Sequence, residues 1–83
     1  MKVQLRYFAA LREALGANEE LSMPEGSTVR DLRDQLLARG GRHAEVLARG
    51  RAVRCALDQI MCDESAPLAD GSEIAFFPPV TGG

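Results

Sequence analysis

One amphipathic helix in the middle of the chain, with alternating segments on both sides, most constrains how this sequence can fold. Thr28 suits the N-cap position, and Asp31 three residues later can complete a capping box with Asp in place of Glu. Apolar residues then recur at i, i+3 and i+7 and form a stripe that can pack on a sheet: Val29, Leu32 and Leu36. Gly40-Gly41 ends this pattern. We therefore expect one main helix that covers a sheet.

The segments on both sides of this helix alternate between apolar and polar residues, as in a strand with one buried face. Val3, Leu5 and Tyr7 give the first such pattern. Further strands are predicted at residues 19–23, 53–57, 60–62 and 73–77, and short helices at 9–15 and 43–49. Two strands before the main helix and three after it imply an α+β roll with its strands on one face of that helix.

Length, charge and hydropathy limit the classes of protein to consider. The 83 residues are enough for one domain with a modest core. The net charge of −2 argues against a nucleic-acid-binding protein that relies on phosphate contacts. No run of apolar residues approaches the length of a membrane span, and none resembles a signal peptide. We therefore expect a cytoplasmic protein that does not associate with a membrane.

The two cysteines, Cys55 and Cys62, are too few for a disulfide framework, and their spacing matches no zinc or redox motif. We expect both to be small core residues. No metal site is predicted, because no cluster of Cys, His and carboxylate residues occurs.

Charge is unevenly distributed along the second half of the chain. Arginines dominate residues 39–54, whereas residues 58–73 carry acidic side chains and no Lys or Arg. This pattern is typical of two solvated faces. Alternatively, the acidic part steers the C-terminal segment into a basic pocket on a partner.

The C-terminal residues have an unusual combination of backbone properties. Pro78-Pro79 cannot continue the strand before it and favours an extended path. Gly82-Gly83 lacks side chains, so a partner could close a narrow channel around this backbone. We predict a folded domain over residues 1–77 and an extended tail over residues 78–83. The alternative is a frayed terminus without a function.

The tail and the strand before it resemble the sulfur-carrier proteins of the ubiquitin-like β-grasp family. The closest likeness is to the small, sulfur-carrying subunits of molybdopterin synthase. It is carried by Pro67-Leu68, Asp70-Gly71 and the run from Glu73 to Gly83, EIAFFPPVTGG. This resemblance implies a β-grasp roll, a mixed sheet packed on one main helix, with the first and last strands parallel and adjacent in the sheet centre.

The resemblance also implies the chemistry of the tail. An adenylating, E1-like activating enzyme uses ATP to activate Gly83, whose carboxylate becomes an acyl-adenylate and then a thiocarboxylate. The tail then enters the large molybdopterin synthase subunit through Pro78, Pro79, Val80, Thr81 and Gly82. There the sulfur is donated to a cyclic pyranopterin in molybdenum cofactor biosynthesis, within a heterotetramer. The chain itself is a non-catalytic carrier that binds no cofactor, and the active site lies on the partner.

Three apolar side chains are predicted to bind that partner. If Ile74 and Phe76 face the helix, Phe77 faces outward, as Phe8 does at the end of the first strand. In parallel neighbouring strands these two rings come close together. Met61 matches a third apolar position of the family's partner-facing surface. The alternative is that one ring folds back into the core.

Two other functions stay open from the sequence. One is a β-grasp sulfur carrier for another pathway, such as thiazole or cysteine synthesis. The other is a ubiquitin-like interaction or conjugation module without a sulfur-carrying role.

Overall fold

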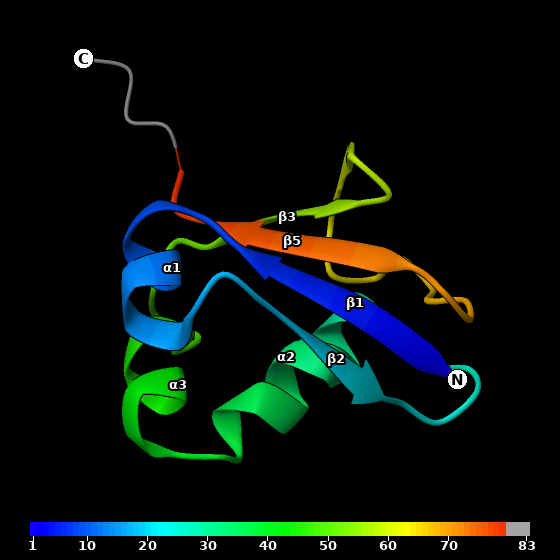
Figure 1. Cartoon of the computed structure of the whole chain (residues 1–83), viewed down its shortest axis with the longest axis horizontal. Coiled ribbons are helices and arrows are strands. Elements are labelled where there is room, and N and C mark those ends of the chain that lie inside the picture. Colours follow the sequence, from blue (N-terminus) through cyan, green and yellow to red (C-terminus); the bar gives the residue numbers. More distant parts are fainter. Residues whose placement is uncertain (80–83) are drawn as a thin grey trace.

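Within residues 1–79, the first and last strands lie side by side at the centre of a five-stranded mixed sheet of order β2-β1-β5-β3-β4 (Figure 1). β1 and β5 are parallel, and every other pairing is antiparallel. The computed structural model describes residues 1–79. In chain order the strands are β1 (Lys2–Tyr7), β2 (Asn18–Ser22), β3 (Arg54–Leu57), β4 (Ile60–Cys62) and β5 (Glu73–Phe77). The parallel pair of first and last strands at the sheet centre is as the resemblance implied.

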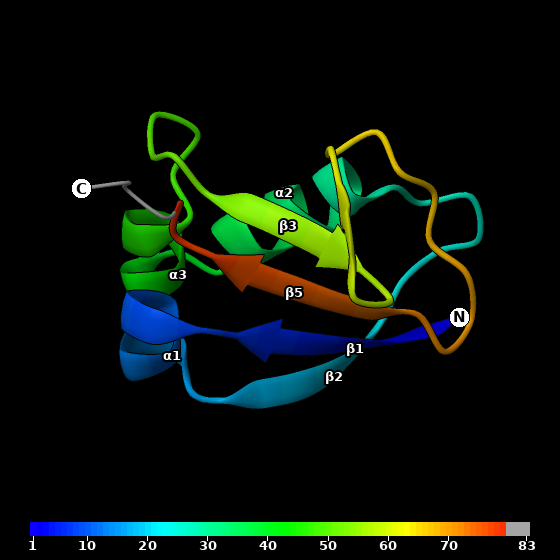
Figure 2. The same cartoon turned by 90° about the horizontal axis from the view of Figure 1, so that it is seen from above.

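The helices lie on one face of this sheet, and the other face is left open (Figures 1 and 2). They are α1 (Ala9–Leu15), α2 (Val29–Leu37) and α3 (Gly41–Val46). α2 is the longest and runs beneath the sheet, whereas α1 and α3 lie at the end where β1 stops. None of these helices is long and apolar enough to cross a lipid bilayer.

The core forms between the sheet and α2, where the buried faces of the strands pack against the apolar stripe of the helix. The strands contribute every second residue to it, and α2 contributes its apolar stripe. Its fully buried members include Val3, Leu5, Tyr7, Ile74 and Phe76 from the sheet, and Val29, Leu32 and Leu36 from α2. These are the core residues expected from both patterns.

The beginning of α2 confirms the predicted capping box. The Asp31 backbone N–H donates to Thr28 Oγ1 at 3.3 Å, and the Thr28 N–H donates to Asp31 Oδ2 at 2.9 Å. Both groups would otherwise lack a partner within the helix.

The second short helix was placed wrongly from the sequence. It was expected at residues 43–49, but α3 spans Gly41–Val46. Gly40 and Gly41 both have positive φ, so the chain reverses there and helical structure begins at once. Leu47, just after α3, is fully buried, and its carbonyl accepts a hydrogen bond from Arg33.

The turn predicted at Asp58-Gln59 joins β3 to β4 in a tight hairpin. Both residues have positive φ, 49° and 70°, as in the two-residue turns that match the twist of a hairpin. This turn sets the register of the two strands, in which Ala56 is opposite Met61 and Cys55 is opposite Cys62.

Candidate functional site

The open face of the sheet carries a group of apolar side chains near the end of β5. Phe77 is the last residue of β5 and lies on the side opposite to buried Phe76. Phe8 follows β1 with extended backbone angles and is 41% exposed. Neither ring belongs to the core or packs against it. The alternative in which one of them folds back into the core is therefore wrong.

The parallel pairing of β1 with β5 brings these two aromatic residues together. Tyr7 is in register with Phe76, so the next residues, Phe8 and Phe77, follow at the same level of the sheet. The Phe8 backbone N–H donates to the Phe76 carbonyl at 3.1 Å. Two aromatic residues from opposite ends of the chain thus lie at one corner of the open face.

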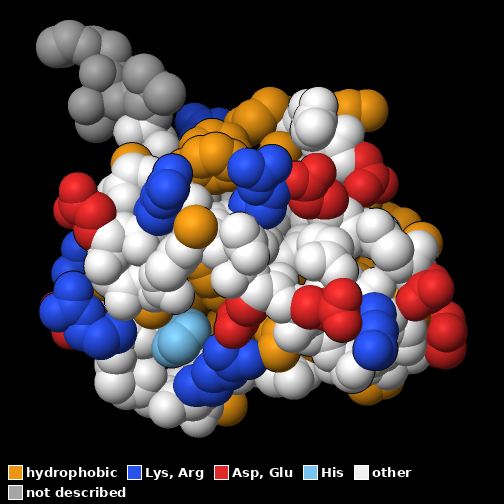
Figure 3. Space-filling view, in the orientation of Figure 1, with side chains coloured by type: hydrophobic (Ala, Val, Ile, Leu, Met, Phe, Trp, Pro, Cys, Tyr) orange, Lys and Arg blue, Asp and Glu red, His pale blue; other side chains and the backbone are white. Residues whose placement is uncertain are grey.

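Met61 joins the same face from the edge strand. Met61 is opposite Ala56 on β3, and Ala56 is opposite Ala75 on β5. Met61 is 56% exposed. The two alanines between it and β1 have small side chains, so Met61 projects above its neighbours. We call Phe8, Ala56, Met61, Ala75 and Phe77 the outer apolar patch. Figure 3 shows hydrophobic side chains gathered over β3 and β5 along the upper side of the molecule.

Two arginines lie beside the aromatic residues of the outer apolar patch. The Arg6 guanidinium carbon is 5.6 Å from the centre of the Phe8 ring, within the range of a cation–π contact. Arg6 also pairs with Glu73 at 3.2 Å. Arg54 is opposite Phe77 in the β3–β5 register and is exposed. Aromatic side chains together with arginine are characteristic of protein-binding surfaces.

The remaining predicted site residues lie at the end of the described chain. Pro78 and Pro79 directly follow β5, outside any strand, and are half-buried. Val80, Thr81, Gly82 and Gly83 lie outside the residues that the structure describes. The predicted division of the chain at residue 77 and the roles of these tail residues stay predictions.

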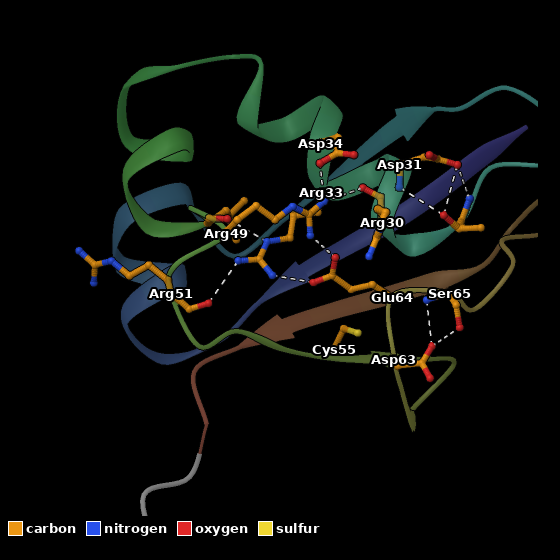
Figure 4. Close-up of polar contacts among 12 residues, drawn as sticks. Arg30, Asp31, Arg33, Asp34, Arg49, Arg51, Cys55, Asp63, Glu64 and Ser65 are labelled. Atoms are coloured by element: carbon orange, nitrogen blue, oxygen red, sulfur yellow. Dashed lines mark hydrogen bonds and ion pairs between the residues drawn. The ribbon is translucent and has the colours of Figure 1, made fainter.

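The basic and acidic segments, which are separate in the sequence, contact one another in the structure (Figure 4). Arg49 pairs with both Asp34 and Glu64. Burial raises the pKa of Glu64, but hydrogen bonds from Arg33 and Arg49 outweigh it, so the pKa of this carboxyl lies below its ordinary value. One arginine of the basic segment is therefore paired with one carboxylate of the acidic segment. Steering of the tail by the acidic segment stays a prediction.

At the centre of this network is a buried arginine that sequence reasoning missed. Arg33 lies on α2, and only 4% of its side chain is exposed. Its Nε donates to the Leu47 carbonyl at 2.8 Å, its Nη2 to the Ala48 carbonyl at 2.7 Å, and its Nη1 to Glu64 at 2.6 Å. An arginine beside Val29, Leu32 and Leu36 in the helical pattern was the only signal for it. Through its hydrogen bonds to these two carbonyls, Arg33 holds the segment after α3 against α2. It lies away from the open face of the sheet.

Sequence reasoning also missed one exposed apolar residue and the closeness of the two thiols. Ile60, in the strand predicted at residues 60–62, is 72% exposed at the edge of the sheet. Cys55 is buried and Cys62 is half-buried against the core, as expected. Their sulfur atoms are 3.6 Å apart. Within residues 1–79, no group of three or more His, Cys, Asp or Glu side chains could hold a metal ion.

A comparison with models of protein families identifies the family of this chain. The model of the ThiS family matches residues 5–83, nearly the whole chain. The chain belongs to the ThiS family. A relative from Escherichia coli (strain K12), named molybdopterin synthase sulfur carrier subunit, is 37% identical over 81 residues, which cover 98% of this chain and 99% of that protein.

Solved structures place this ThiS-family chain in the same fold class. A chain in the protein–protein complex of subunits 1 and 2 of the molybdopterin-converting factor from Helicobacter pylori 26695 aligns with a TM-score of 0.71 and 27% identity, over 100% of both chains. SAMP1 from Haloferax volcanii aligns with a TM-score of 0.79 and 24% identity over 100% of both chains, which supports the fold alone. The expected ubiquitin-like β-grasp fold and sulfur-carrier family are confirmed.

Proposed function

We propose that this protein is a sulfur carrier in molybdenum cofactor biosynthesis and that it acts as the small subunit of molybdopterin synthase. The observation that carries the proposal is the E. coli relative of that name, which matches the chain over nearly its full length. The Gly82-Gly83 end and the outer apolar patch at the end of β5 are consistent with this role.

The partner in this proposal is the large molybdopterin synthase subunit, and the outer apolar patch is its docking site. A solved relative is a chain in a complex of subunits 1 and 2 of a molybdopterin-converting factor. In the patch, Phe8 and Met61 are 41% and 56% exposed and are large enough to be anchors in a partner's pockets. Because Phe77 is followed directly by Pro78-Pro79, docking of the patch would also direct the tail toward the partner.

The chemistry we propose takes place at the terminal carboxylate of Gly83. An activating enzyme uses ATP to form an acyl-adenylate, and a sulfur nucleophile displaces AMP to leave a thiocarboxylate. Inside the large subunit, this sulfur is transferred to a cyclic pyranopterin. No step needs a side chain of this protein, and the carrier itself binds no cofactor.

The intact mass of the full chain tests this proposal most directly. The chain is incubated with ATP, an adenylating partner and a sulfur source, and its mass should increase by the difference between one sulfur and one oxygen atom. Deletion of Gly83 should abolish the increase, whereas the control variant Cys55→Ala/Cys62→Ala should keep it. A persulfide on a cysteine would instead add a whole sulfur atom.

An unchanged mass would overturn the proposal if the same adenylating partner activates a known carrier in parallel. Isopeptide-linked products on target lysines would point instead to a conjugating modifier.

A further inference from the structure

The two cysteines of the chain face one another across the β3–β4 hairpin, and the proposed function does not use either of them. Cys55 Sγ lies 3.6 Å from Cys62 Sγ and 3.4 Å from the Cys62 carbonyl oxygen, to which it donates. Both are free thiols. The hairpin thus holds them as a dithiol rather than as two separate core side chains.

The backbone of this hairpin suits a disulfide. Residues directly opposite on antiparallel strands have Cα atoms about 4.5–5.5 Å apart, within the range of roughly 4.4–6.8 Å that disulfides span. The sulfur atoms have to approach by about 1.6 Å to reach bonding distance. Side-chain rotation can supply this movement without a change in strand pairing.

The two thiols differ in their access to solvent. Cys62 is half-buried, so a small reagent can reach it. Cys55 is only 4% exposed and lies between β5 and β4. An external reagent therefore meets Cys62 first, and Cys55 can react only with what is already bound to Cys62.

We propose that Cys55 and Cys62 are an oxidisable dithiol, a modification site at which a low-molecular-weight disulfide such as oxidised glutathione introduces a cross-strand disulfide. In the first step the Cys62 thiolate attacks one sulfur of glutathione disulfide, whose S–S bond breaks and releases one glutathione thiolate. In the second step the Cys55 thiolate attacks the Cys62 sulfur and displaces the second glutathione. The two cysteine protons end on the two released thiols, and two electrons pass from the protein to the reagent.

The surroundings of Cys55 determine the rate of the second step. Burial, followed by its hydrogen bond to Cys62, raises the pKa of Cys55 to about 12. Little thiolate is then present at neutral pH, so ring closure is slow and becomes faster as pH rises. The same cost of ionising Cys55 disfavours reopening, so the disulfide persists once it has formed.

The structural consequence concerns the edge of the sheet. β4 has three residues and, within residues 1–79, pairs only with β3, so few hydrogen bonds hold it in the sheet. A disulfide at Cys62 would tie it to the sheet beside Met61. That Met61 is thereby fixed within a partner-binding surface rests on the proposed function, whereas the thiol chemistry does not.

The experiment uses the full chain and excess oxidised glutathione at mildly alkaline pH. We expect the intact mass to fall by two hydrogen atoms without an adduct, both free thiols to disappear, and dithiothreitol to restore them. The melting temperature should rise by about 10–20 °C, because the crosslink restricts the unfolded chain. Amide hydrogen exchange in β4 should slow at least tenfold, and by a larger factor than in β2, the edge strand on the other side of the sheet.

Two single variants separate the roles of the thiols. Cys55→Ala should stop at a stable mixed disulfide with one glutathione on Cys62, whereas Cys62→Ser should stay unmodified because its remaining thiol is buried. The proposal is overturned if the native chain keeps both thiols, keeps a glutathione adduct, or forms linked dimers instead. It is also overturned if Cys62→Ser reacts as fast as Cys55→Ala. None of these outcomes depends on a sulfur-carrying role.

Discussion

Phe76 and Phe77 are neighbours on β5 whose side chains lie on opposite faces of the sheet, and this contrast makes the sharpest test of the outer apolar patch. Phe76 is fully buried, whereas Phe77 is half-buried and does not pack against the core. Alanine substitution should therefore affect mainly stability at the first position and mainly partner binding at the second.

The expected sizes follow from these two environments. Phe76→Ala removes a ring from the core and should lower the free energy of unfolding by about 3–5 kcal/mol. A chain of 83 residues has a total stability of about 4–12 kcal/mol, so this loss is severe. Phe77→Ala exposes little new core surface and should cost about 1 kcal/mol or less. If Phe77 is an interface anchor, its loss should weaken the partner complex by about 2 kcal/mol or more, which is about 30-fold in Kd.

Two measurements on each variant give the test. Melting followed by circular dichroism reports stability, and calorimetric titration with the large molybdopterin synthase subunit reports affinity. We expect Phe76→Ala to lower Tm by at least about 12 °C, and Phe77→Ala to lower it by no more than about 8 °C. If Phe76→Ala does not fold, Phe76→Leu keeps most of the core volume and provides the control.

The opposite pattern of stability and affinity would contradict a docking role for Phe77. If Phe77→Ala lowers Tm as much as Phe76→Ala while Kd is unchanged, Phe77 is a core residue. The outer apolar patch is then not the docking surface.

Two further predictions concern the charge network behind the sheet. Arg33→Ala leaves the carbonyls of Leu47 and Ala48 without their buried donor, while Glu64 keeps Arg49 as a partner, so the free energy of unfolding should fall by about 2–4 kcal/mol in urea titration. Exposed Arg30, one turn earlier on α2, is the matched control, and an equal loss in Arg30→Ala would contradict this account. The pKa of Glu64 is lowered in the folded protein, so its stabilising contribution is complete above its ordinary value of 4.5 and is lost as pH falls below it. Glu64→Gln should therefore flatten the dependence of Tm on pH in this acidic range, and an unchanged slope would show that Glu64 is not responsible.

Local sequence patterns were sufficient for most of the elements. The cap at Thr28, the apolar stripe of α2 and the alternation in β1 each depend on residues close together in the chain. The turn at Asp58-Gln59 is equally local, and a two-residue turn there necessarily places Cys55 opposite Cys62. The thiol pair could therefore have been found from the sequence, had the register of the hairpin been followed to its end.

Tertiary structure decided the features that join distant parts of the chain. The parallel pairing of β1 with β5 brings Phe8 beside Phe77. Local sequence patterns cannot predict this contact between distant residues, and only the family resemblance implied it. Burial of Arg33 was equally hidden, because its partners come from the segment after α3 and from the loop after β4. The sequence by itself determined which faces are apolar and where the chain turns, since these depend on side-chain period and backbone freedom. The assembled sheet decided which outward residues meet, because the register of β1 with β5 joins residues from opposite ends of the chain.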